Sequence, residues 1–232
     1  RDWSVTGVQT CALPICPNFV ASPRGQAIAF NNPVGFGIAD ELMLLPNNFG
    51  ALDNASFSIA LLMRSVDNSQ INGRLFGNNF SAAGMGFGYN REHSSNAGIF
   101  MRDTAVNGPS FFDNTAGPEG YVVDGNWHWL VLVVDRTAET ATAWIDGHSQ
   151  TQSIAGLGAT SFANLRLGAL DDINSSTGDA FGARNTWVDD LRIYNHALSA
   201  AEVGALAVPE PSAGLLTGAV LLASLLVRTR GF

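Results

Sequence analysis

Short apolar runs alternate with clusters of glycine, asparagine, aspartate and serine over most of the chain, from about Phe19 to Leu206. Apolar runs of about four to eight residues between turn-forming residues are typical of an antiparallel sandwich or barrel. One of them, His128–Val134, is apolar on both faces, which predicts a strand in the centre of a packed sheet. The predicted strands are Phe57–Arg64, Gly98–Arg102, His128–Val134, Thr140–Ile145, Leu165–Gly168 and Val188–Tyr194.

The connections between these runs carry signals of their own. Residues 135–139 are a plausible hairpin connection, and Asp146-Gly147 is a strong turn signal after the second strand. Ser199-Ala-Ala-Glu202 is a capping box and predicts a short helix over about Ala200–Leu206, which the prolines in 208–211 must end. The glycine-rich stretch Gly84–Gly88 contains no lysine and precedes no helix start, so we expect a β turn or a bulge there.

Composition narrows the function classes. The 232 residues suffice for one large all-β domain or two small domains. Charged residues make up 14%, with no lysine, which favours a loop-rich β protein over a helical bundle. The formal net charge of −8 argues against a nucleic-acid partner, because phosphate binding needs clustered basic residues. The acidity leaves two interpretations: solubility, or cation binding by some of the aspartates.

The first 15 residues have no strand alternation, and we do not interpret them as part of the fold. Arg1–Ile15 resembles the translated sequencing-adapter read-through found at the ends of environmental gene assemblies. We therefore interpret residues 1–16 as an artefact or a disordered segment, and expect the native start to be missing. Cys11 and Cys16 lie in this segment; they could close a small disulfide loop but cannot complete a zinc site. The remaining sequence has no cysteine that would indicate a redox compartment.

Five stretches, in this order, resemble one family. Gly125-Asn-Trp-His-Trp-Leu-Val and Ala143-Trp-Ile-Asp-Gly147 are similar to two of its consecutive strands, and Leu165-Arg-Leu-Gly168 to a third. Trp187-Val-Asp-Asp-Leu-Arg-Ile-Tyr, running on to Glu202, carries the most specific motif, and Ala27–Asn31 is a weaker match to the opening strands. Together they resemble the laminin-G-like, concanavalin A-like lectin/glucanase jelly roll over about residues 24–206. The resemblance implies an all-β, antiparallel two-sheet jelly-roll sandwich over residues 17–207.

Several side chains in these motifs have alternative interpretations. Trp127, Trp129, Val131 and Val133 share one face of a strand, which we interpret as a core face; the alternative is a platform on which sugars stack. His128 is expected to be a hydrogen-bonded core or rim residue and not a base. Arg192 and Tyr194 share a face, and we expect the arginine to fix a loop or to pair with an acid.

Glycoside hydrolysis by enzymes of this broad fold needs two carboxylates roughly 5–9.5 Å apart. No glutamate has another acid two residues away on a predicted strand, and the adjacent pairs Asp40-Glu41 and Asp189-Asp190 point to opposite faces. The glutamates are Glu41, Glu92, Glu119, Glu139, Glu202 and Glu210. The sequence also has no nucleophile elbow, zinc-protease motif or nucleotide-binding loop. We therefore expect no catalytic residues.

Calcium is the one cofactor that the resemblance implies, because members of the family often carry one calcium ion at the sheet rim. Asp189 is the best candidate ligand, Asn31 the second and Asp190 the fallback; the alternative for Asp189 is hydrogen bonding to a neighbouring loop. The loop 171–179 does not fit an EF-hand and is expected at the rim, exposed to solvent. Its acids, Asp171, Asp172 and Asp179, are the loop candidates for a glycan or second-metal surface.

The chain ends in a charge-free apolar stretch, residues 213–227, followed by Arg228 and Arg230. As a helix it would span about 22 Å, less than the bilayer core of about 30 Å. The order of Pro209-Glu210-Pro211, apolar span and arginine-containing end resembles the PEP-CTERM sorting signal of exopolysaccharide-producing Gram-negative bacteria. The resemblance implies export, a short transmembrane helix within 208–232 with its C-terminus in the cytoplasm, and removal of the tail by an exosortase-type enzyme.

The function expected from these observations is an exported, non-catalytic carbohydrate- or matrix-binding adhesion module, sorted to the cell surface or the exopolysaccharide matrix. Its expected partners are the exosortase-type enzyme, an extracellular polysaccharide or glycan, and the membrane before processing. Two alternatives stay open: a glucanase-type glycoside hydrolase, and a purely structural component of the extracellular matrix.

Overall fold

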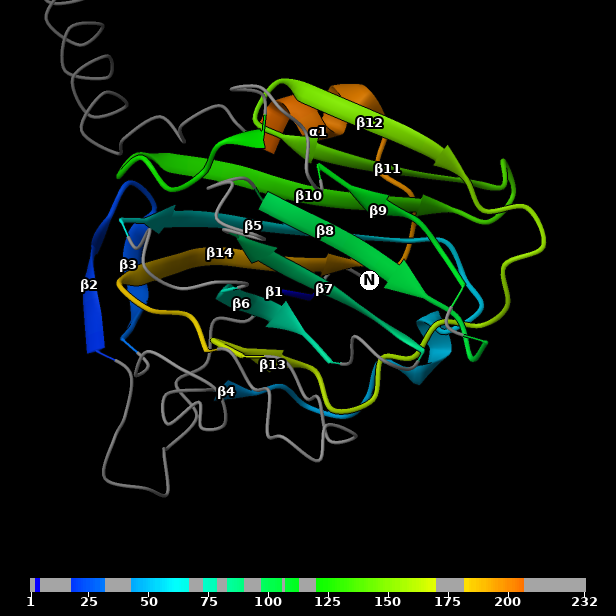
Figure 1. Cartoon of the computed structure of the whole chain (residues 1–232), viewed down its shortest axis with the longest axis horizontal. Helices are drawn as coiled ribbons and strands as arrows, with labels where there is room; N and C mark the ends of the chain where they lie inside the picture. The colour runs from blue at the N-terminus through cyan, green and yellow to red at the C-terminus, as the bar shows by residue number, and fades with distance from the viewer. Residues whose placement is uncertain are drawn as a thin grey trace, which may run out of the picture.

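The computed structural model describes residues 3–4, 18–31, 43–66, 73–78, 83–89, 97–105, 107–112, 120–169 and 182–206. In this part of the chain two antiparallel sheets lie face to face, with one α-helix on the far side of the rear sheet (Figure 1). The predicted two-sheet antiparallel sandwich is therefore confirmed. The rear sheet, sheet A, has the strand order β12-β11-β10-β5-β14-β3-β2, with β1 paired to β14. The front sheet, sheet B, has the order β4-β13-β6-β7-β8-β9.

The bounds of the elements follow the apolar runs closely. Sheet A consists of β1 (Trp3–Ser4), β2 (Asn18–Ser22), β3 (Gly25–Phe30), β5 (Phe57–Ser65), β10 (Trp127–Asp135), β11 (Thr140–Ile145), β12 (His148–Ser153) and β14 (Thr186–Tyr194). Sheet B consists of β4 (Met43–Leu44), β6 (Gly73–Gly77), β7 (Gly84–Tyr89), β8 (Ala97–Arg102), β9 (Ser110–Phe111) and β13 (Arg166–Leu167). A 3₁₀ turn, η1 (Gly50–Leu52), and the helix α1 (Ala200–Leu206) complete the described part.

The main core lies between the two sheets. Alternate residues of β5 and β10 point into it, because side chains on a strand change face at every residue. Leu61 and Leu130 are opposite each other in the pairing of β5 with β10, and both are fully buried. Aromatic rings fill the space towards sheet B: Phe57 meets Phe162 edge to face at 4.8 Å between ring centroids. The strand predicted to be apolar on both faces, β10, is an inner strand of sheet A, as expected.

The other face of β10 lies in a second apolar cluster, outside the sandwich. Trp129, Val131 and Val133 pack there with Leu198 and Val203, and so α1 covers the outer face of sheet A. The predicted core face is thus buried, but beneath a helix and not between the sheets. The expectation that all four side chains are core residues is wrong for Trp127, which packs at the edge of the cluster and stays partly exposed.

Arg24, in the turn between β2 and β3, holds the end of this helix. Its guanidinium lies over the Trp129 ring, 5.6 Å from the ring centroid, and its Nη2 donates to the carbonyl of Leu206 at 2.6 Å. The helix start is fixed by the predicted capping box, in which Ser199 N–H donates to Glu202 Oε2 at 2.8 Å and Glu202 N–H donates to Ser199 Oγ at 3.3 Å. Both ends of α1 are therefore anchored.

The glycine-rich stretch Gly84–Gly88 is not a turn, because it is most of β7, a buried strand of sheet B. The alternative prediction of a bulge agrees with a register shift in the partner strand β6, between Arg74 and Phe76, opposite Gly88 and Phe87. Met85 and Phe87 point into the core, and the glycines alternate with them. A Cβ added at Gly88 would lie 2.8 Å from the carbonyl oxygen of Gly73 on the neighbouring strand. Glycine is needed here for the close approach of two strands and not for a turn.

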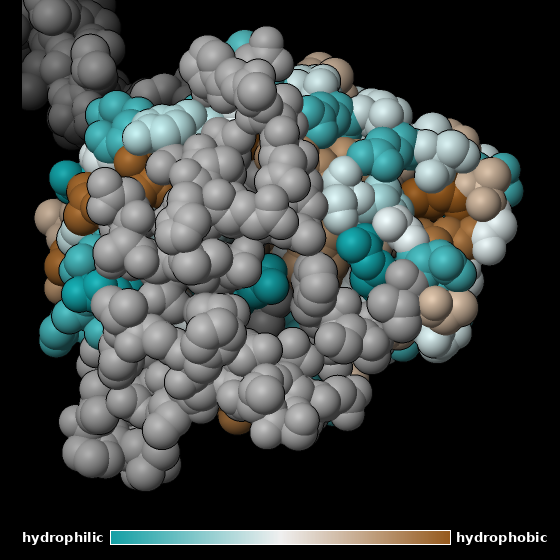
Figure 2. All heavy atoms as spheres, viewed as in Figure 1, coloured by the Kyte–Doolittle hydropathy of each residue, from teal (hydrophilic) through white to brown (hydrophobic). Residues whose placement is uncertain are grey.

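The edge strand β12 was not predicted, because His-Ser-Gln-Thr-Gln-Ser contains no apolar residue. It pairs with β11 through the two-residue turn Asp146-Gly147, which confirms the turn prediction. Hydrophilic side chains gather along the edge of the molecule where β12 lies (Figure 2). A polar surface of this kind protects an open sheet edge from pairing with other chains.

Most of the terminal segments lie outside the described residues. Within 1–16 only Trp3–Ser4 is described, and it pairs with Ile193 and Arg192 of β14, so the interpretation of this segment as an artefact stays a prediction. The tail, residues 207–232, is outside as well, and the predicted C-terminal hydrophobic helix and the sorting motif at 209–211 stay predictions too. No helix within the described ranges is long and apolar enough to span a membrane.

Candidate functional site

Three side chains form a row across the outer face of sheet A, beside the area covered by α1. The register places Trp127 of β10 opposite Arg64 of β5, and Arg64 opposite Trp187 of β14. Residues opposite each other in a sheet point to the same face, and neighbouring strands are roughly 4.8 Å apart. All three side chains are partly exposed. We call them the Trp–Arg–Trp row.

Arg64 is held from two sides. Its Nε donates to the carbonyl of Gly125 at 2.7 Å, and its guanidinium lies over the ring of Trp187, 5.0 Å from the ring centroid. Cation–π stacking of this kind orients the guanidinium plane. Among the residues that the structure describes, no carboxylate pairs with Arg64, and its two outer nitrogens have no hydrogen-bond acceptor. The row therefore presents an oriented cation stacked on one indole ring, with a second indole on the strand at its other side.

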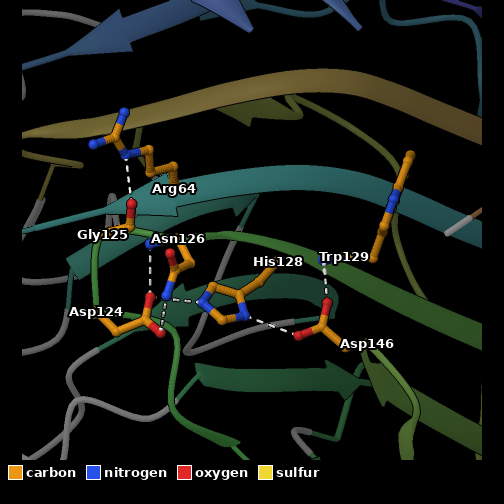
Figure 3. Close-up of polar contacts among 7 residues, drawn as sticks. All are labelled: Arg64, Asp124, Gly125, Asn126, His128, Trp129 and Asp146. Carbon is orange, nitrogen blue, oxygen red and sulfur yellow. Dashed lines mark hydrogen bonds and ion pairs between the residues drawn. The ribbon is translucent and has the colours of Figure 1, made fainter. Parts of the chain in front are cut away.

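His128 and two aspartates form a cluster next to this row (Figure 3). The imidazole Nδ1 is 2.8 Å from Asp146 Oδ2, and Nε2 is 2.9 Å from Asp124 Oδ1. Asp146 also accepts the backbone N–H of Trp129 at 2.9 Å through its other oxygen. His128 is buried, with a side-chain exposure of 11%. The prediction of a hydrogen-bonded core or rim histidine is confirmed.

The environment of His128 favours its protonated form. Burial opposes the charge, but hydrogen bonds to Asp146 and Asp124 outweigh burial and raise the pKa of the imidazole above its ordinary value. For Asp124, burial alone would raise the pKa, but hydrogen bonds from His128 and Asn126 lower it to about 2. The imidazole thus lies between two carboxyl groups whose hydrogen bonds favour its charged form.

This cluster fixes the turn that holds Arg64. Asp124 Oδ1 accepts the backbone N–H of Asn126 at 2.7 Å, and the N–H of Gly125 donates to the carbonyl of Ser65 at 3.0 Å. Gly125 has a φ of 83°, a conformation that glycine adopts without strain. These hydrogen bonds hold the turn 124–126, and the Gly125 carbonyl points at Arg64 (Figure 3).

The predicted metal residues on β14 make contacts within the protein. One oxygen of Asp189 accepts the hydroxyl of Ser22, and the other accepts the N–H of Asp190 at 2.7 Å. Asp190, at a φ of 49° in a β-bulge, forms a two-pronged ion pair with Arg192 at 2.6 Å for both contacts. This pair raises the pKa of the guanidinium, although burial opposes the charge. The expectation that Arg192 pairs with an acid is confirmed.

The candidate calcium ligands do not come together in one site. Asn31 follows β3 directly after Phe30, which is opposite Thr186, whereas the register of β3 with β14 brings Asp189 level with Ala27. Four residues along a strand separate Asn31 from that level by about 13 Å. Both oxygens of Asp190 accept hydrogen bonds from Arg192, and each oxygen of Asp189 accepts one hydrogen bond, from Ser22 or from Asp190. Within the described ranges, no group of three or more acids, histidines or cysteines could hold a metal ion.

The remaining predicted site residues lie outside the described part of the chain. These are the loop candidates Asp171, Asp172 and Asp179, and the sorting motif Pro209, Glu210 and Pro211.

Nearly all described carboxylates accept hydrogen bonds from the chain itself. Asp103, for example, accepts backbone N–H groups at Ala105, Asn107 and Gly158, and these bonds lower its pKa. The remaining one, Glu139, is exposed in the hairpin between β10 and β11. The carboxylates with such bonds are Asp53, Asp103, Asp124, Asp135, Asp146, Asp189, Asp190 and Glu202. Their arrangement stabilises loops and leaves no open acid–base pair in the described region.

Comparison with solved structures shows the same fold in toxin binding domains. The binding domain of Paraclostridial Mosquitocidal Protein 1 matches with a TM-score of 0.63 at 16% identity, over 82% of this chain and 45% of that one. The binding domain of botulinum neurotoxin serotype G matches with a TM-score of 0.56 at 16% identity, over 82% and 44%. This chain thus spans less than half the length of either. At these identities the likeness shows the fold alone.

No curated protein matches the sequence. One family model matches residues 38–204, most of the chain: Laminin_G_3, the concanavalin A-like lectin/glucanases superfamily. The match covers all of sheet B and the strands β5, β10, β11, β12 and β14 of sheet A. The order of the motifs, the two antiparallel sheets and the helix over sheet A agree with that match. The chain therefore belongs to the concanavalin A-like lectin/glucanases superfamily.

Proposed function

We propose that this protein is a non-catalytic carbohydrate-binding module. The observation that carries the proposal is the Trp–Arg–Trp row on the outer face of sheet A. In this row the guanidinium of Arg64 is stacked on one partly exposed indole, and a second partly exposed indole lies on the strand at its other side. Aromatic faces provide apolar contact for sugar rings, and an oriented guanidinium donates hydrogen bonds to sugar oxygens. The family includes lectins, which is consistent with such a role.

Binding without hydrolysis is supported by the use of the described carboxylates. A glycosidase needs two of them on either side of a substrate bond, with space for water or for the covalent intermediate. The closest arrangement is Asp124 and Asp146, and the imidazole of His128 fills the space between their carboxylates. The solved relatives are themselves named binding domains, which agrees with the proposal. The glucanase alternative would need carboxylates elsewhere in the chain.

A glycan array tests this function on the purified full-length chain, with and without calcium. We expect retention of one or more polysaccharides, with no new reducing ends after prolonged incubation. Absence of binding under both conditions would contradict the proposal and favour a purely structural matrix component. Binding together with the release of reducing ends would favour the glucanase alternative.

Calcium binding is a separate proposal that rests on Asp189. Its carboxylate has lone pairs beyond those used by Ser22 and Asp190, and calcium takes oxygen ligands in flexible geometry. Calcium bound to the folded state alone would stabilise it. EDTA should then lower the melting temperature, and added calcium should restore it, in the wild type but not in Asp189→Asn. An unchanged melting temperature in EDTA would exclude the site.

Export and sorting are also proposed, from the sequence of the tail. Pro209-Glu210-Pro211 is the segment we propose to be read by an exosortase-type enzyme after export to the cell surface or extracellular matrix. The intact mass of the protein from its native host tests this, because processing removes the residues after the motif. A full-length C-terminus in the membrane fraction would contradict it.

A further inference from the structure

We propose that the Trp–Arg–Trp row binds a uronic acid unit of an acidic polysaccharide. In this arrangement the sugar ring lies on Trp127, and its carboxylate faces the outer nitrogens of Arg64. Trp187 does not touch the ligand and positions Arg64 by stacking. The inference rests on the proposed carbohydrate-binding function and names its substrate class.

The first argument is the spacing of the row. Trp127 and Trp187 lie two strands apart, which is roughly 9.6 Å between their backbones, with Arg64 midway. Because Trp187 lies beneath the guanidinium, Trp127 is the indole of the row that is left for a ligand. A sugar ring on Trp127 would therefore be next to Arg64.

The second argument is the chemistry of each side chain. The face of an indole carries negative charge, and one face of a pyranose ring presents C–H groups with a weak positive charge, so the two attract. A guanidinium can donate two parallel hydrogen bonds to one carboxylate, which is its strongest kind of contact with an anion. Neutral sugar hydroxyls make only one such bond at a time, without the charge term.

The third argument is that Arg64 has no anionic partner within the described residues. Arg192, on the adjacent strand β14, is paired with Asp190 through two hydrogen bonds, whereas the hydrogen bond of Arg64 goes only to a neutral carbonyl. A guanidinium whose outer nitrogens have no acceptor favours a carboxylate that comes from a ligand. The carbonyl of Gly125 and the Trp187 ring already orient it, so little side-chain entropy is lost on binding.

The line of the row continues beyond Trp187 onto two further strands, which suits the binding of an extended polysaccharide. Ala29 of β3 is opposite Trp187, and Asn18 of β2 is opposite Ala29. The small side chain of Ala29 rises little above the sheet, and the exposed Asn18 then places an amide on the same line. An amide both donates and accepts hydrogen bonds and can contact a further sugar of the same polymer.

The net charge of −8 does not exclude an acidic ligand. Repulsion between distant charges is screened beyond about 8 Å at physiological ionic strength. A direct contact between a carboxylate and Arg64 is much shorter than that distance. The positive charge of Arg64 therefore matters more for binding an acidic ligand than the net charge of the protein. We expect this binding to be measurable at physiological salt.

The test uses alginate oligomers, which are chains of uronic acids, with dextran oligomers as the neutral probe. Binding to the purified full-length chain is measured by titration calorimetry. We expect alginate to bind, and Arg64→Gln to lower its affinity about tenfold or more through the loss of one charge-assisted contact. Trp127→Ala should lower the affinity by about the same factor, because the apolar face under the sugar ring is lost. Trp127→Phe should keep most of the affinity for alginate. Trp187→Ala should also lower this affinity, and Trp187→Phe, which keeps an aromatic ring under Arg64, should keep most of it. Unfolding midpoints of all variants check that they are folded.

Trp144→Ala is the matched control. Trp144 is also a partly exposed tryptophan on the outer face of sheet A, opposite Val131 and outside the row. Its removal should leave alginate binding unchanged. Alginate binding that is equal in wild type, Trp127→Ala and Arg64→Gln would overturn the inference while leaving carbohydrate binding intact, as would preference for dextran. Absence of binding to both probes overturns it as well, and the proposed function falls only if the glycan array is also negative.

Discussion

Replacing His128 by phenylalanine tests whether the Asp124–His128–Asp146 cluster stabilises the fold as a charged unit. Phenylalanine keeps a planar ring in the same space, so the main change is the loss of both ring nitrogens. Asp146 and Asp124 then lose hydrogen bonds of 2.8 and 2.9 Å from a protonated imidazole. The perturbation is electrostatic, with little cavity formation.

The size of the effect follows from the exposure of the three groups. A hydrogen bond to a charged group contributes roughly 1.5–3 kcal/mol, so two fully buried bonds would give about 3–6 kcal/mol. The aspartates are not fully buried, since the side chain of Asp124 is 30% exposed and that of Asp146 is 46% exposed. Water can replace part of what they lose. We therefore expect His128→Phe to lower the free energy of unfolding by about 3 kcal/mol below neutral pH.

The effect should depend on pH in one direction. In the unfolded chain the imidazole has its ordinary pKa of about 6.5, and in the folded protein the two aspartates raise it. A raised folded pKa gives stability that is fully present below about pH 6.5 and is lost as the pH rises through the folded value. At high pH a neutral imidazole has one N–H to donate and faces the other carboxylate with a lone pair. The difference between wild type and variant should then shrink to about 1 kcal/mol.

Urea unfolding at about pH 5.5, 7 and 9 measures this difference. His148→Phe is the control, because His148 is an exposed histidine at the start of β12; a surface change there should stay within about 0.5 kcal/mol. A difference for His128→Phe that is the same at all three pH values would refute the reasoning. It would mean that the imidazole has the same pKa in the folded and the unfolded chain.

Three further substitutions probe packing and backbone, each measured by the same unfolding experiment. Phe57→Ala removes a fully buried ring that meets Phe162 edge to face and should cost about 3–5 kcal/mol; less than about 1 kcal/mol would contradict the core assignment. Gly108→Ala, between β8 and β9, should lower the free energy of unfolding by at least about 2 kcal/mol, because Gly108 has a φ of 146° and the new Cβ would lie 2.2 Å from the carbonyl oxygen of Met101. A variant as stable as the wild type would contradict this backbone conformation. Ser199→Ala removes the cap of α1 and should cost about 1 kcal/mol, whereas Ser199→Asp, which also caps, should keep most of the stability.

The fold could be predicted wherever apolar side chains mark a strand. Thr140–Ile145 and Ala200–Leu206 have the bounds expected from their sequence, since an alternating run and a capping box are local signals. β12 is polar throughout, and its position depends on pairing with β11. In β7 the alternation is between glycine and large residues, which resembles a turn until the close approach of β6 is known. Both strands are decided by contacts between strands and not by local composition.

The candidate site could be predicted only in part, for the same reason. Trp127 and His128 belong to one recognisable motif, but Arg64 is a single arginine at the end of an apolar run and gave no signal. Its importance comes from the register of three strands that are distant in sequence. The sequence predicts Asp146 as a turn residue, and the turn between β11 and β12 confirms this. The pairing of β10 with β11 also brings Asp146 to His128, which no local pattern reveals.

The attachment of α1 to sheet A determines where mechanical load would enter the domain. The helix packs on Trp129, Val131 and Val133 of β10, an inner strand, and Arg24 ties its last carbonyl to the turn between β2 and β3. A pull on the chain at Leu206 would therefore be shared between a central strand and the opposite edge of the sheet. Peeling strands from one edge breaks their hydrogen bonds one after another, whereas this attachment requires a packed helix to be lifted off an apolar surface first. Force applied at Leu206 would therefore load sheet A through α1 before it peels any strand from an edge.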